Sequence, residues 1–310
     1  MFHPTLSNWG RIVYAPIIKF CEWLGERHPV TLVKIRYFQR FKKWPDLKNP
    51  KDLNEKILYL KLFTDTSEWT RLADKYRVRE YVKQRGLEKC LIDLIGVWDN
   101  VKDIDFDVLP NAFIFKANNG DGKGSNLIVT DKSKLDRETA RKTLDGWLHK
   151  KHVGALSAEP QYKGIEPRVI AEALLPIEEG QKSLVDYKIW CFNGKAHYIW
   201  ATANRDNDST EVMTYDREWT PMPEVCVFDN RYREGKLMPK PKNLDDMLQV
   251  AEKLTEGFPC VRLDLYNVSG HIYFGEMTFT SFSGMMNFYT PEFLAKCGDL
   301  VDLSTVKKLK

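Results

Sequence analysis

The chain has 310 residues, enough for one large domain or two to three lobes that bury a core without disulfides, so a small stapled scaffold is excluded. Hydrophobic residues make up 43% and charged residues 29%, a balance typical of a globular chain and not of a disordered or membrane-spanning one. The formal net charge is +4, but nine Lys and Arg against three Asp and Glu fall within residues 1–50, so the basicity belongs to the N-terminal segment.

The cysteine spacing and the first apolar run indicate where the protein works. Six cysteines are spread over the chain with no Cys-x-x-Cys pair, which argues against a zinc ribbon or a dense disulfide framework and favours a reducing cytoplasm. The apolar run Ile12–Ile18 is too short to span a bilayer and contains Pro16. We therefore expect neither a signal peptide nor a transmembrane helix.

Helical periodicity covers the N-terminal segment, residues 1–48, and is clearest over residues 9–24. Residues 34–44 then interleave Lys and Arg with aromatic side chains. One interpretation is a docking surface for anionic lipid headgroups or an acidic polymer, which would give peripheral contact with the inner face of a membrane through residues 9–44. The other is an ordinary amphipathic helix whose cationic stems cover core aromatics. Nothing in the spacing demands a ligand, which favours the ordinary helix.

Two further helices are expected before the first strands. Residues Asp52 to Glu55 resemble a capping box, and Ser67 opens a helix that Gly86 would end. From residue 91 the pattern changes to short apolar runs bounded by turns, and Leu109-Pro110 marks a lobe boundary.

Strands and hairpins dominate the remainder. We expect strands at 113–117, 126–130, 168–175, 185–192, 196–203, 261–268 and 271–279, and helices at 136–148 and 243–254. Asn193-Gly194 and Ser269-Gly270 are the predicted hairpin turns. Helices that alternate with antiparallel hairpins predict an α+β fold of two or three lobes.

A glycine-rich loop lies between the first two of these strands. Gly120, Gly122 and Gly124, with Lys116 and Lys123, would let backbone N–H groups and cations approach a polyphosphate. A P-loop would need Gly at position 117, where this chain has Ala, and a Rossmann turn would need a helix after the loop, where a strand is predicted. The loop therefore fits neither motif. The alternative is a mobile hairpin tip, and the loop alone leaves both interpretations open.

Two carboxylates mark the last hairpin. Alternation puts Arg262, Asp264 and Tyr266 on one face of the first strand, and Glu276 and Thr278 on one face of the next. Two carboxylates on the same face repel each other unless a cation lies between them. Mg²⁺, which also binds phosphate oxygens, prefers oxygen ligands such as these carboxylates. The alternative is two solvent-facing acids on an edge hairpin.

Other polar residues lie between these features. Glu172 precedes Leu174 and so combines an apolar slot with a hydrogen-bonding edge, as adenine requires. Asp186 and Lys188 share a strand face, and Arg205 follows the next strand. Each of the three, taken alone, is more often a partner in a surface salt bridge.

Together these features resemble the ATP-grasp superfamily, and the stretch from about Lys48 to Phe279 resembles the TupA-like ATP-grasp proteins of polysaccharide biosynthesis. The matching phrases are Asn54-Glu-Lys-Ile57, Ala73-Asp-Lys-Tyr76, Arg79-Glu-Tyr81, Phe115-Lys-Ala-Asn118, Ile170-Ala-Glu172, Asp186-Tyr-Lys188, Phe192-Asn-Gly194, Val261-Arg-Leu-Asp264 and Gly275-Glu276. The resemblance implies an ATP-grasp fold in which two α+β lobes grip ATP after a mostly helical N-terminal region. The expected segments are 1–48, an N-terminal lobe at 49–110, a small lobe with the glycine flap at 111–172, and a large lobe at 173–310.

The resemblance also implies a role for each candidate residue in binding ATP and Mg²⁺. Lys75 and Lys116 would reach the phosphates under the flap Gly120–Gly124, Glu172 and the backbone near Leu174 would receive adenine, and Glu178 or Asp186 would bind ribose. Lys188 and Arg205 would neutralise the transferred phosphoryl group and the substrate carboxylate, and Asp264 and Glu276 would hold Mg²⁺. Many relatives carry Asn where this chain has Thr278, which weakens a second metal site.

The function expected from this resemblance is ATP-dependent ligation of a carboxylate to an amine through an acyl phosphate. The substrates would be an amino acid or other amine and a uronic acid of a surface polysaccharide or its precursor, with no nucleic acid partner. Two alternatives remain open. One is a glycosyltransferase that uses Asp206-Asn-Asp208 as a metal motif, and the other is a non-catalytic nucleotide-binding docking protein.

Overall fold

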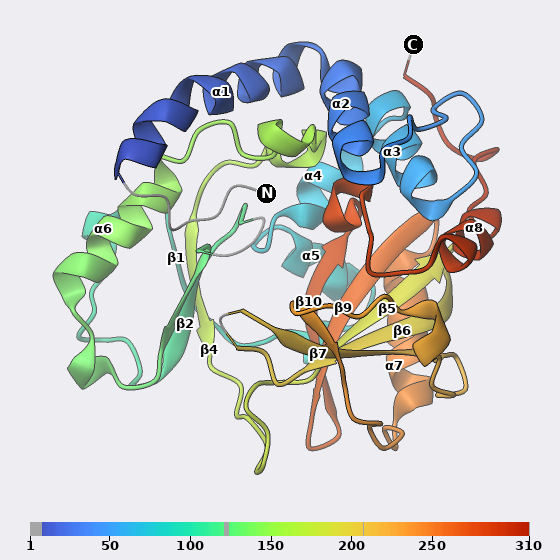
Figure 1. Cartoon of the computed structure of the whole chain (residues 1–310). Helices are drawn as coiled ribbons and strands as arrows, with labels where there is room; N and C mark the ends of the chain where they lie inside the picture. Colours follow the sequence, from blue (N-terminus) through green and yellow to red (C-terminus); the bar gives the residue numbers. More distant parts are fainter. Residues whose placement is uncertain (1–7, 121–123, 207, 310) are drawn as a thin grey trace.

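Two β-sheets and the helices that cover them make up the fold (Figure 1). The computed structural model describes residues 8–120, 124–206 and 208–309. The α+β architecture and the helical N-terminal region are confirmed.

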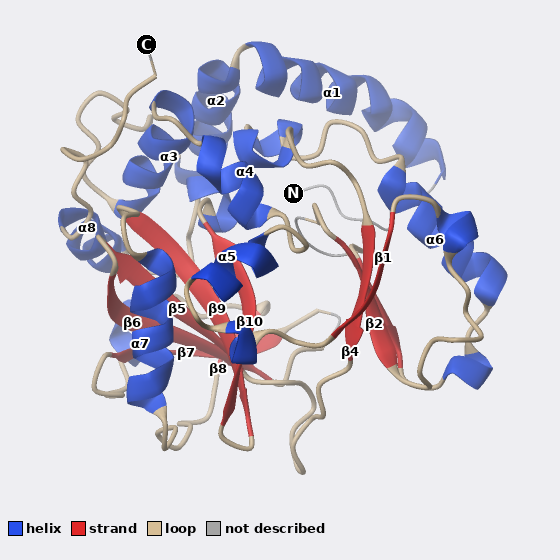
Figure 2. Ribbon diagram, turned by 180° about the vertical axis from the view of Figure 1, so that it is seen from behind, coloured by secondary structure: helices blue, strands red, loops and turns tan. Residues whose placement is uncertain are grey.

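The N-terminal segment is a bent pair of consecutive helices along the outer edge of the molecule (Figures 1 and 2). It consists of α1 (Asn8–Arg27) and α2 (Pro29–Phe41). Helix α1 packs on the short 3₁₀ turn η4 (Ala155–Ser157). A Cβ at Gly25 would lie 1.9 Å from the Ala155 carbonyl oxygen, so this close approach needs glycine.

Helix α3 (Leu53–Phe63) begins at the predicted cap. The Asp52 carboxylate accepts a hydrogen bond from the Glu55 backbone N–H at 2.9 Å. Glu55 does not complete the capping box, because its own carboxylate accepts from the backbone N–H groups of Asp46 and Lys51. The side chain therefore anchors the preceding loop.

The single helix predicted from Ser67 to Gly86 is wrong. The structure has two helices, α4 (Ser67–Ala73) and α5 (Val78–Gln84). The Asp74 carboxylate accepts from the backbone N–H groups of Tyr76 and Arg77, and such a turn competes with helix continuation. The break places Lys75 in a tight turn.

The smaller sheet has four strands in the order β1-β4-β2-β3. Its strands are β1 (Leu94–Trp98), β2 (Phe113–Ala117), β3 (Asn126–Val129) and β4 (Val169–Ala173). Helix α6 (Arg137–Leu148) packs its buried Ala140 and Leu144 against Phe113 and Phe115. Strand pairing between β1 and β4 crosses the predicted boundary at residue 110, and the predicted lobe limits stay a prediction.

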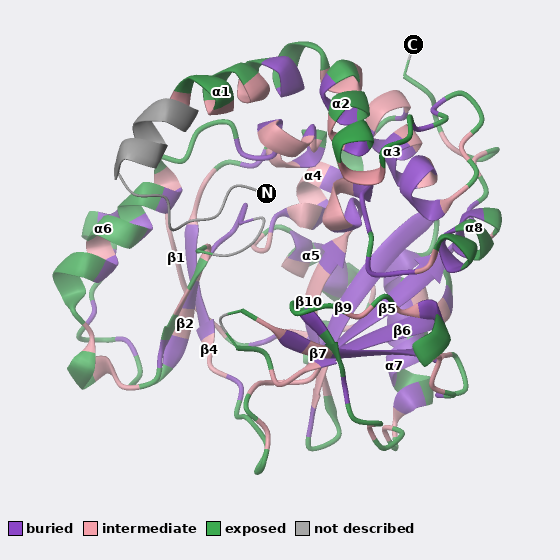
Figure 3. Ribbon diagram, in the orientation of Figure 1, coloured by how far each residue is buried: buried purple, intermediate pink, exposed green. Residues whose placement is uncertain are grey.

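The larger sheet has six strands in the order β10-β9-β5-β6-β7-β8. They are β5 (Asp186–Phe192), β6 (Lys195–Ala203), β7 (Thr210–Asp216), β8 (Tyr232–Glu234), β9 (Cys260–Val268) and β10 (His271–Thr278). Helix α7 (Leu244–Thr255) contacts β5, β6 and β9, and α8 (Pro291–Asp299) contacts α3. Burial is nearly continuous along β5 and β9 (Figure 3).

Both predicted hairpin turns are confirmed by their backbone angles. Asn193 and Gly194 have φ of 50° and 75°, and Ser269 and Gly270 have φ of 50° and 85°. Two successive positive φ values are typical of a type I′ turn, which matches the twist of the flanking strands. The sequence did not predict β1, β7, β8 or α8.

Short 3₁₀ turns connect the remaining segments. They are η1 (Glu88–Cys90), η2 (Val101–Asp103), η3 (Lys132–Lys134), η5 (Pro160–Tyr162), η6 (Pro223–Val225) and η7 (Ser281–Gly284).

Candidate functional site

A buried ionic cluster crosses the middle of the larger sheet. The carboxylate of Asp264 on β9 accepts two hydrogen bonds of 2.7 Å from the Arg262 guanidinium and one of 2.5 Å from the Lys188 ammonium. Lys188 stands opposite Asp264 on β5. Burial alone would raise the pKa of Asp264, but the two cations reverse this effect and hold the pKa below its ordinary value. The carboxylate is therefore ionised and held in one orientation.

A β-bulge brings the second carboxylate to the same face. From the turn at Ser269-Gly270, a regular register would pair Gly275 with Asp264 and turn Glu276 to the opposite face. The bulge at Gly275 instead pairs Glu276 with Asp264, and Thr278 with Arg262. Arg262 then lies 3.5 Å from the Glu276 carboxylate and 3.1 Å from the Thr278 hydroxyl.

Asp186 lies at the edge of the same cluster. It receives Lys188 at 2.5 Å and Arg205 at 3.5 Å on one oxygen. Among the described residues no hydrogen-bond donor reaches its other oxygen, Oδ1. Its pKa is raised, since burial penalises the charged form more than Lys188 favours it. The charge of Asp186 in turn raises the pKa of Tyr266, its partner across the strands.

Lys75 connects the larger sheet to the glycine loop of the smaller one. Its ammonium donates to the Gly120 carbonyl at 2.7 Å and lies 4.0 Å from the Glu276 carboxylate. The Asn118 side chain fixes the turn before Lys75 by donating to Asp74 at 3.0 Å. Two of the phrases noted in the sequence, at residues 73–76 and 115–118, therefore meet in space.

A second set of charges lies on the smaller sheet. Glu172 on β4 receives Lys116 of β2 at 2.7 Å and Arg79 of α5 at 3.0 Å. All three side chains are largely buried. Strand pairing places Glu172 opposite Ile114, two residues before Lys116, so the lysine reaches the carboxylate diagonally across the ladder.

The other predicted cofactor residues surround these charges at greater distance. Leu174 follows the end of β4. The Glu178 carboxylate accepts the backbone N–H of Ser269, at the tip of the β9–β10 hairpin. Gly124 has φ of 87° and its carbonyl accepts the Trp147 indole N–H at 2.7 Å. Gly122 and Lys123 lie outside the described residues.

The oxygens of the cluster fit Mg²⁺ in part. Asp264 Oδ2 already accepts hydrogen bonds from two cations, whereas Oδ1 accepts from Arg262 alone among the described residues. Oδ1 and the half-exposed Glu276 carboxylate thus keep lone pairs for a hard cation. The Thr278 hydroxyl accepts from Arg262 and donates to Glu276, so it orients the carboxylate. Within the described chain no group of three or more His, Cys, Asp or Glu is placed to hold a metal.

Arg262 is the residue that the sequence analysis placed on this face without giving it a role. It is 6% exposed and touches Asp264, Thr278, Glu276 and the Ser281 hydroxyl. The signal was its spacing of two from Asp264 on a strand, which puts a cation beside the carboxylate.

Asp206 of the proposed Asp206-Asn-Asp208 metal motif makes local hydrogen bonds, and Asn207 lies outside the described residues. The Asp206 carboxylate accepts the backbone N–H groups of Asp208 and Ser209 and the Ser209 hydroxyl. These bonds engage both carboxylate oxygens. No described contact links Asp206 to the buried cluster.

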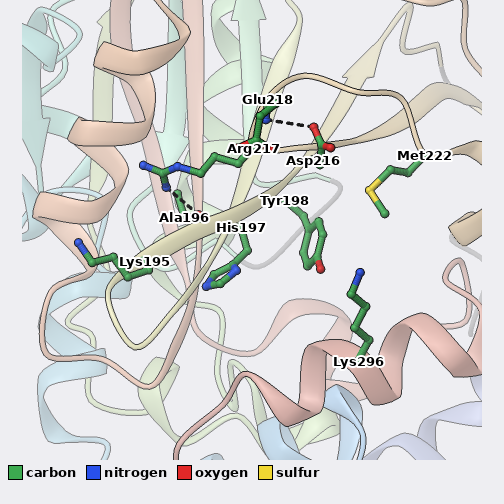
Figure 4. Close-up of a pocket in the computed structure, with 9 residues that line it drawn as sticks. All are labelled: Lys195, Ala196, His197, Tyr198, Asp216, Arg217, Glu218, Met222 and Lys296. Carbon is green, nitrogen blue, oxygen red and sulfur yellow. Dashed lines mark hydrogen bonds between the residues drawn. The ribbon is translucent and has the colours of Figure 1, made fainter.

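A pocket of about 450 Å³ opens at the opposite end of the larger sheet (Figure 4). Its lining residues Lys195 and Tyr198 lie about 23 Å and about 13 Å along β6 from Thr202, the residue that pairs with Asp186. Its main cation, Arg217, already donates to the Ala196 carbonyl and to Glu252. This pocket is therefore separate from the buried cluster.

The sequence model described as TupA-like ATPgrasp matches residues 55–302 of the chain. No curated protein matches the chain. Solved structures with similar folds include two of D-alanine–D-alanine ligase from Bacillus anthracis. The one complexed with ATP has a TM-score of 0.44 and 16% identity, with 76% of this chain and 64% of that chain covered. The other has a TM-score of 0.46 and 12% identity, with coverages of 92% and 89%.

An N5-carboxyaminoimidazole synthetase from Staphylococcus aureus complexed with ADP is also similar, with a TM-score of 0.43 and 12% identity. The match covers 80% of this chain and 55% of the synthetase chain. The chain thus spans less than two thirds of the length of the first of these structures. With TM-scores below 0.5, these likenesses carry no weight for activity, whereas the family match covers most of the chain.

Proposed function

The chain belongs to the TupA-like ATP-grasp family, and from this premise we propose that it is an ATP-dependent ligase that joins a carboxylate to an amine. Both sheets contribute charged residues to the proposed site. The observation that carries the proposal is the buried contact of Asp264 with both Arg262 and Lys188, next to the half-exposed Glu276.

The cations would bind the nucleotide and balance the charge of the transferred phosphoryl group. Lys116 and Lys75 are proposed to contact the ATP phosphates, with Glu172 turned toward adenine once its lysine engages phosphate. Lys188, Arg262 and Arg205 would face the phosphoryl group. Fixed cations in a buried site stabilise developing negative charge without reorganisation. Mg²⁺, held by Glu276 and Asp264 Oδ1, would neutralise phosphate oxygens.

The proposed reaction has two steps. In the first, a substrate carboxylate oxygen attacks the γ-phosphorus, the bond to the β-γ bridging oxygen breaks, and ADP and an acyl phosphate form. In the second, the amine nitrogen attacks the acyl carbon, phosphate leaves with the C–O bond electrons, and the nitrogen loses a proton. Positioning of the two substrates supplies much of the acceleration in such reactions.

We further propose that the acid is a uronic acid of a surface polysaccharide or its precursor and that the amine is an amino acid. The support is the resemblance to polysaccharide-biosynthesis proteins of this family. The cation-rich reaction face agrees with a substrate that brings its own carboxylate.

A direct test incubates the protein with Mg-ATP, a panel of uronic acids and mixed amino acids, and measures ADP and amide by mass spectrometry. We expect continued turnover to ADP and amide only when acid and amine are both present, because the acid alone can form ADP and a bound acyl phosphate but cannot complete the second step. Lys188→Met should lower the rate at least about 100-fold, whereas the matched control Lys142→Met, on the exposed side of α6, should not. Absence of ADP and amide for every pairing would contradict the proposal.

A nucleotide-binding docking protein is the second candidate, because Thr278 is committed to hydrogen bonds within the protein and the N-terminal helices expose aromatic side chains. Tight binding of Mg-ATP with no turnover for any acid and amine would favour it.

A further inference from the structure

Exposed apolar side chains are concentrated on helices α1 and α2 and on the residues just after α2. Of the twelve large hydrophobic side chains that are exposed among the described residues, six lie within residues 15–44. These six are Ile17, Phe20, Trp23, Ile35, Phe38 and Trp44. Phe20 stacks on Trp23, and Phe38 stacks on Trp44 at 4.6 Å between ring centroids. A concentration of exposed apolar side chains of this kind marks an interaction site.

The helices that carry these exposed side chains are anchored to the rest of the protein. Their buried side chains Leu24, Leu32, Val33 and Tyr37 are at most 8% exposed and belong to one core cluster. At the C-terminal half of α1, the Glu26 carboxylate contacts the His152 ring at 2.7 Å. The two helices lie along the outer edge of the molecule in both views (Figures 1 and 2). A planar partner could therefore approach it without displacing the lobes.

The charge of the same segment is strongly positive. Residues 15–44 contain seven Lys and Arg against two acidic residues, Glu22 and Glu26, and Glu26 is engaged by His152. Lys19, Lys34, Lys42 and Lys43 are exposed. Helices that combine aromatic side chains with cations bind at the interface of an anionic bilayer.

A groove of about 680 Å³ adjoins α2 and shares Lys34 with it. Five of its lining residues are aliphatic or aromatic hydrocarbons, one is Tyr59, and three are lysines. An acidic glycan would need many polar lining groups as hydrogen-bond partners, whereas mostly apolar lining side chains together with lysines complement an acyl chain beneath an anionic headgroup. The groove therefore favours a lipid over a glycan.

We propose that helices α1 and α2 dock the protein on an anionic phospholipid bilayer. Their exposed aromatic side chains enter the headgroup region, the lysines contact lipid phosphates, and the groove next to α2 takes part of a lipid molecule. No described helix is long and apolar enough to cross a membrane, and this docking needs none. The proposal is independent of the ligase activity, and its test needs no turnover.

The test is flotation of the full chain with phosphatidylcholine vesicles and with vesicles of equal parts phosphatidylcholine and phosphatidylglycerol. We expect binding to the anionic vesicles alone, weakened by salt. Trp23→Ser combined with Trp44→Ser, and separately Lys42→Glu, should each weaken binding by about fivefold or more, since one cation near such a surface contributes about 1 kcal/mol. The matched controls Leu237→Ser and Lys134→Glu, both at exposed positions, should bind like the wild type.

Several results would overturn the proposal. These are equal binding to neutral and anionic vesicles, binding that the Trp and Lys variants leave unchanged, or a dimer in light scattering that the Trp variant abolishes. Retention on polygalacturonate that depends on Lys42 but not on the tryptophans, with no vesicle binding, would assign the surface to an acidic polymer. Thermal melts of each variant within about 2 °C of wild type establish that the fold is intact.

Discussion

A single methyl group added at Gly275, in the β-bulge, should disturb the site. A Cβ added there would lie 2.9 Å from the carbonyl oxygen of Asp264 and 3.4 Å from the Tyr266 ring. The oxygen belongs to the backbone of the paired strand, so β10 must move relative to β9. Glu276, the next residue, would then shift away from Asp264. Gly275→Ala should therefore impair both stability and turnover.

The size of the effect follows from the contact. Overpacking of this kind costs about 1–3 kcal/mol, and about 2.1 cal/mol/K of unfolding entropy per residue converts each kcal/mol to roughly 1.5 °C in a chain of 310 residues. We expect a fall of about 1.5–5 °C in Tm. A displacement of about 1 Å at reacting groups costs on the order of 100-fold in rate.

Differential scanning calorimetry and ADP release under the proposed reaction measure the two effects. Gly146→Ala is the matched control, because Gly146 lies inside helix α6 with no atom within 4 Å of an added Cβ. That change should stabilise the protein by about 0.5–1 kcal/mol and leave the rate unchanged. If Gly275→Ala matches the wild type in both Tm and rate, the bulge does not position Glu276.

Three further predictions concern buried or paired groups. Arg262→Met leaves Asp264 with one cation instead of two, and should lower the free energy of unfolding by about 3–5 kcal/mol in calorimetry. The pKa of Asp264 is lowered in the folded state, so its ionised form stabilises the wild type above the ordinary carboxyl pKa, and this stabilisation is lost as pH falls. Below about pH 4, the free energy of unfolding of the variant should therefore depend less on pH than that of the wild type. The hydrogen bond to Glu26 raises the pKa of His152. The protonated ring therefore stabilises the folded state fully below about pH 6.5, and this stabilisation is lost as pH rises through the folded-state pKa. Glu26→Gln should lower the pKa of His152 measured by NMR. Burial raises the pKa of the Cys191 thiol to about 12, so iodoacetamide at pH 8 should leave it unmodified in the native state and label it after denaturation, as peptide mass spectrometry would show.

Local signals in the sequence were sufficient for the hairpin turns and for the start of α3. Asn193-Gly194 and Ser269-Gly270 can take positive φ at low cost, and Asp52 caps a helix through its own neighbours. These features depend on residues within a few positions of one another.

The features that the sequence did not predict depend on distant partners. The helix breaks at Asp74 because its carboxylate caps a turn that Asn118 also binds, and Asn118 lies 44 positions later. Strand β8 pairs in parallel with β7 across a long connection, and an edge strand of three residues has little periodicity of its own.

The sequence predicted which charged residues belong to the candidate site, but not which of them contact one another. The acids Asp264 and Glu276 were placed on one face, but only the bulge, which no alternation rule contains, makes those faces coincide. Arg262 received no role because its second and third partners, Thr278 and Ser281, come from the next strand and loop.

The most direct test of the central claim is isotope transfer from a substrate labelled with ¹⁸O in both carboxylate oxygens. If the chain activates a carboxylate as an acyl phosphate, one labelled oxygen should appear in the released inorganic phosphate for each amide formed, and Lys188→Met should abolish both products together. Amide formation with unlabelled phosphate, or phosphate release from ATP that is independent of acid and amine, would contradict the account.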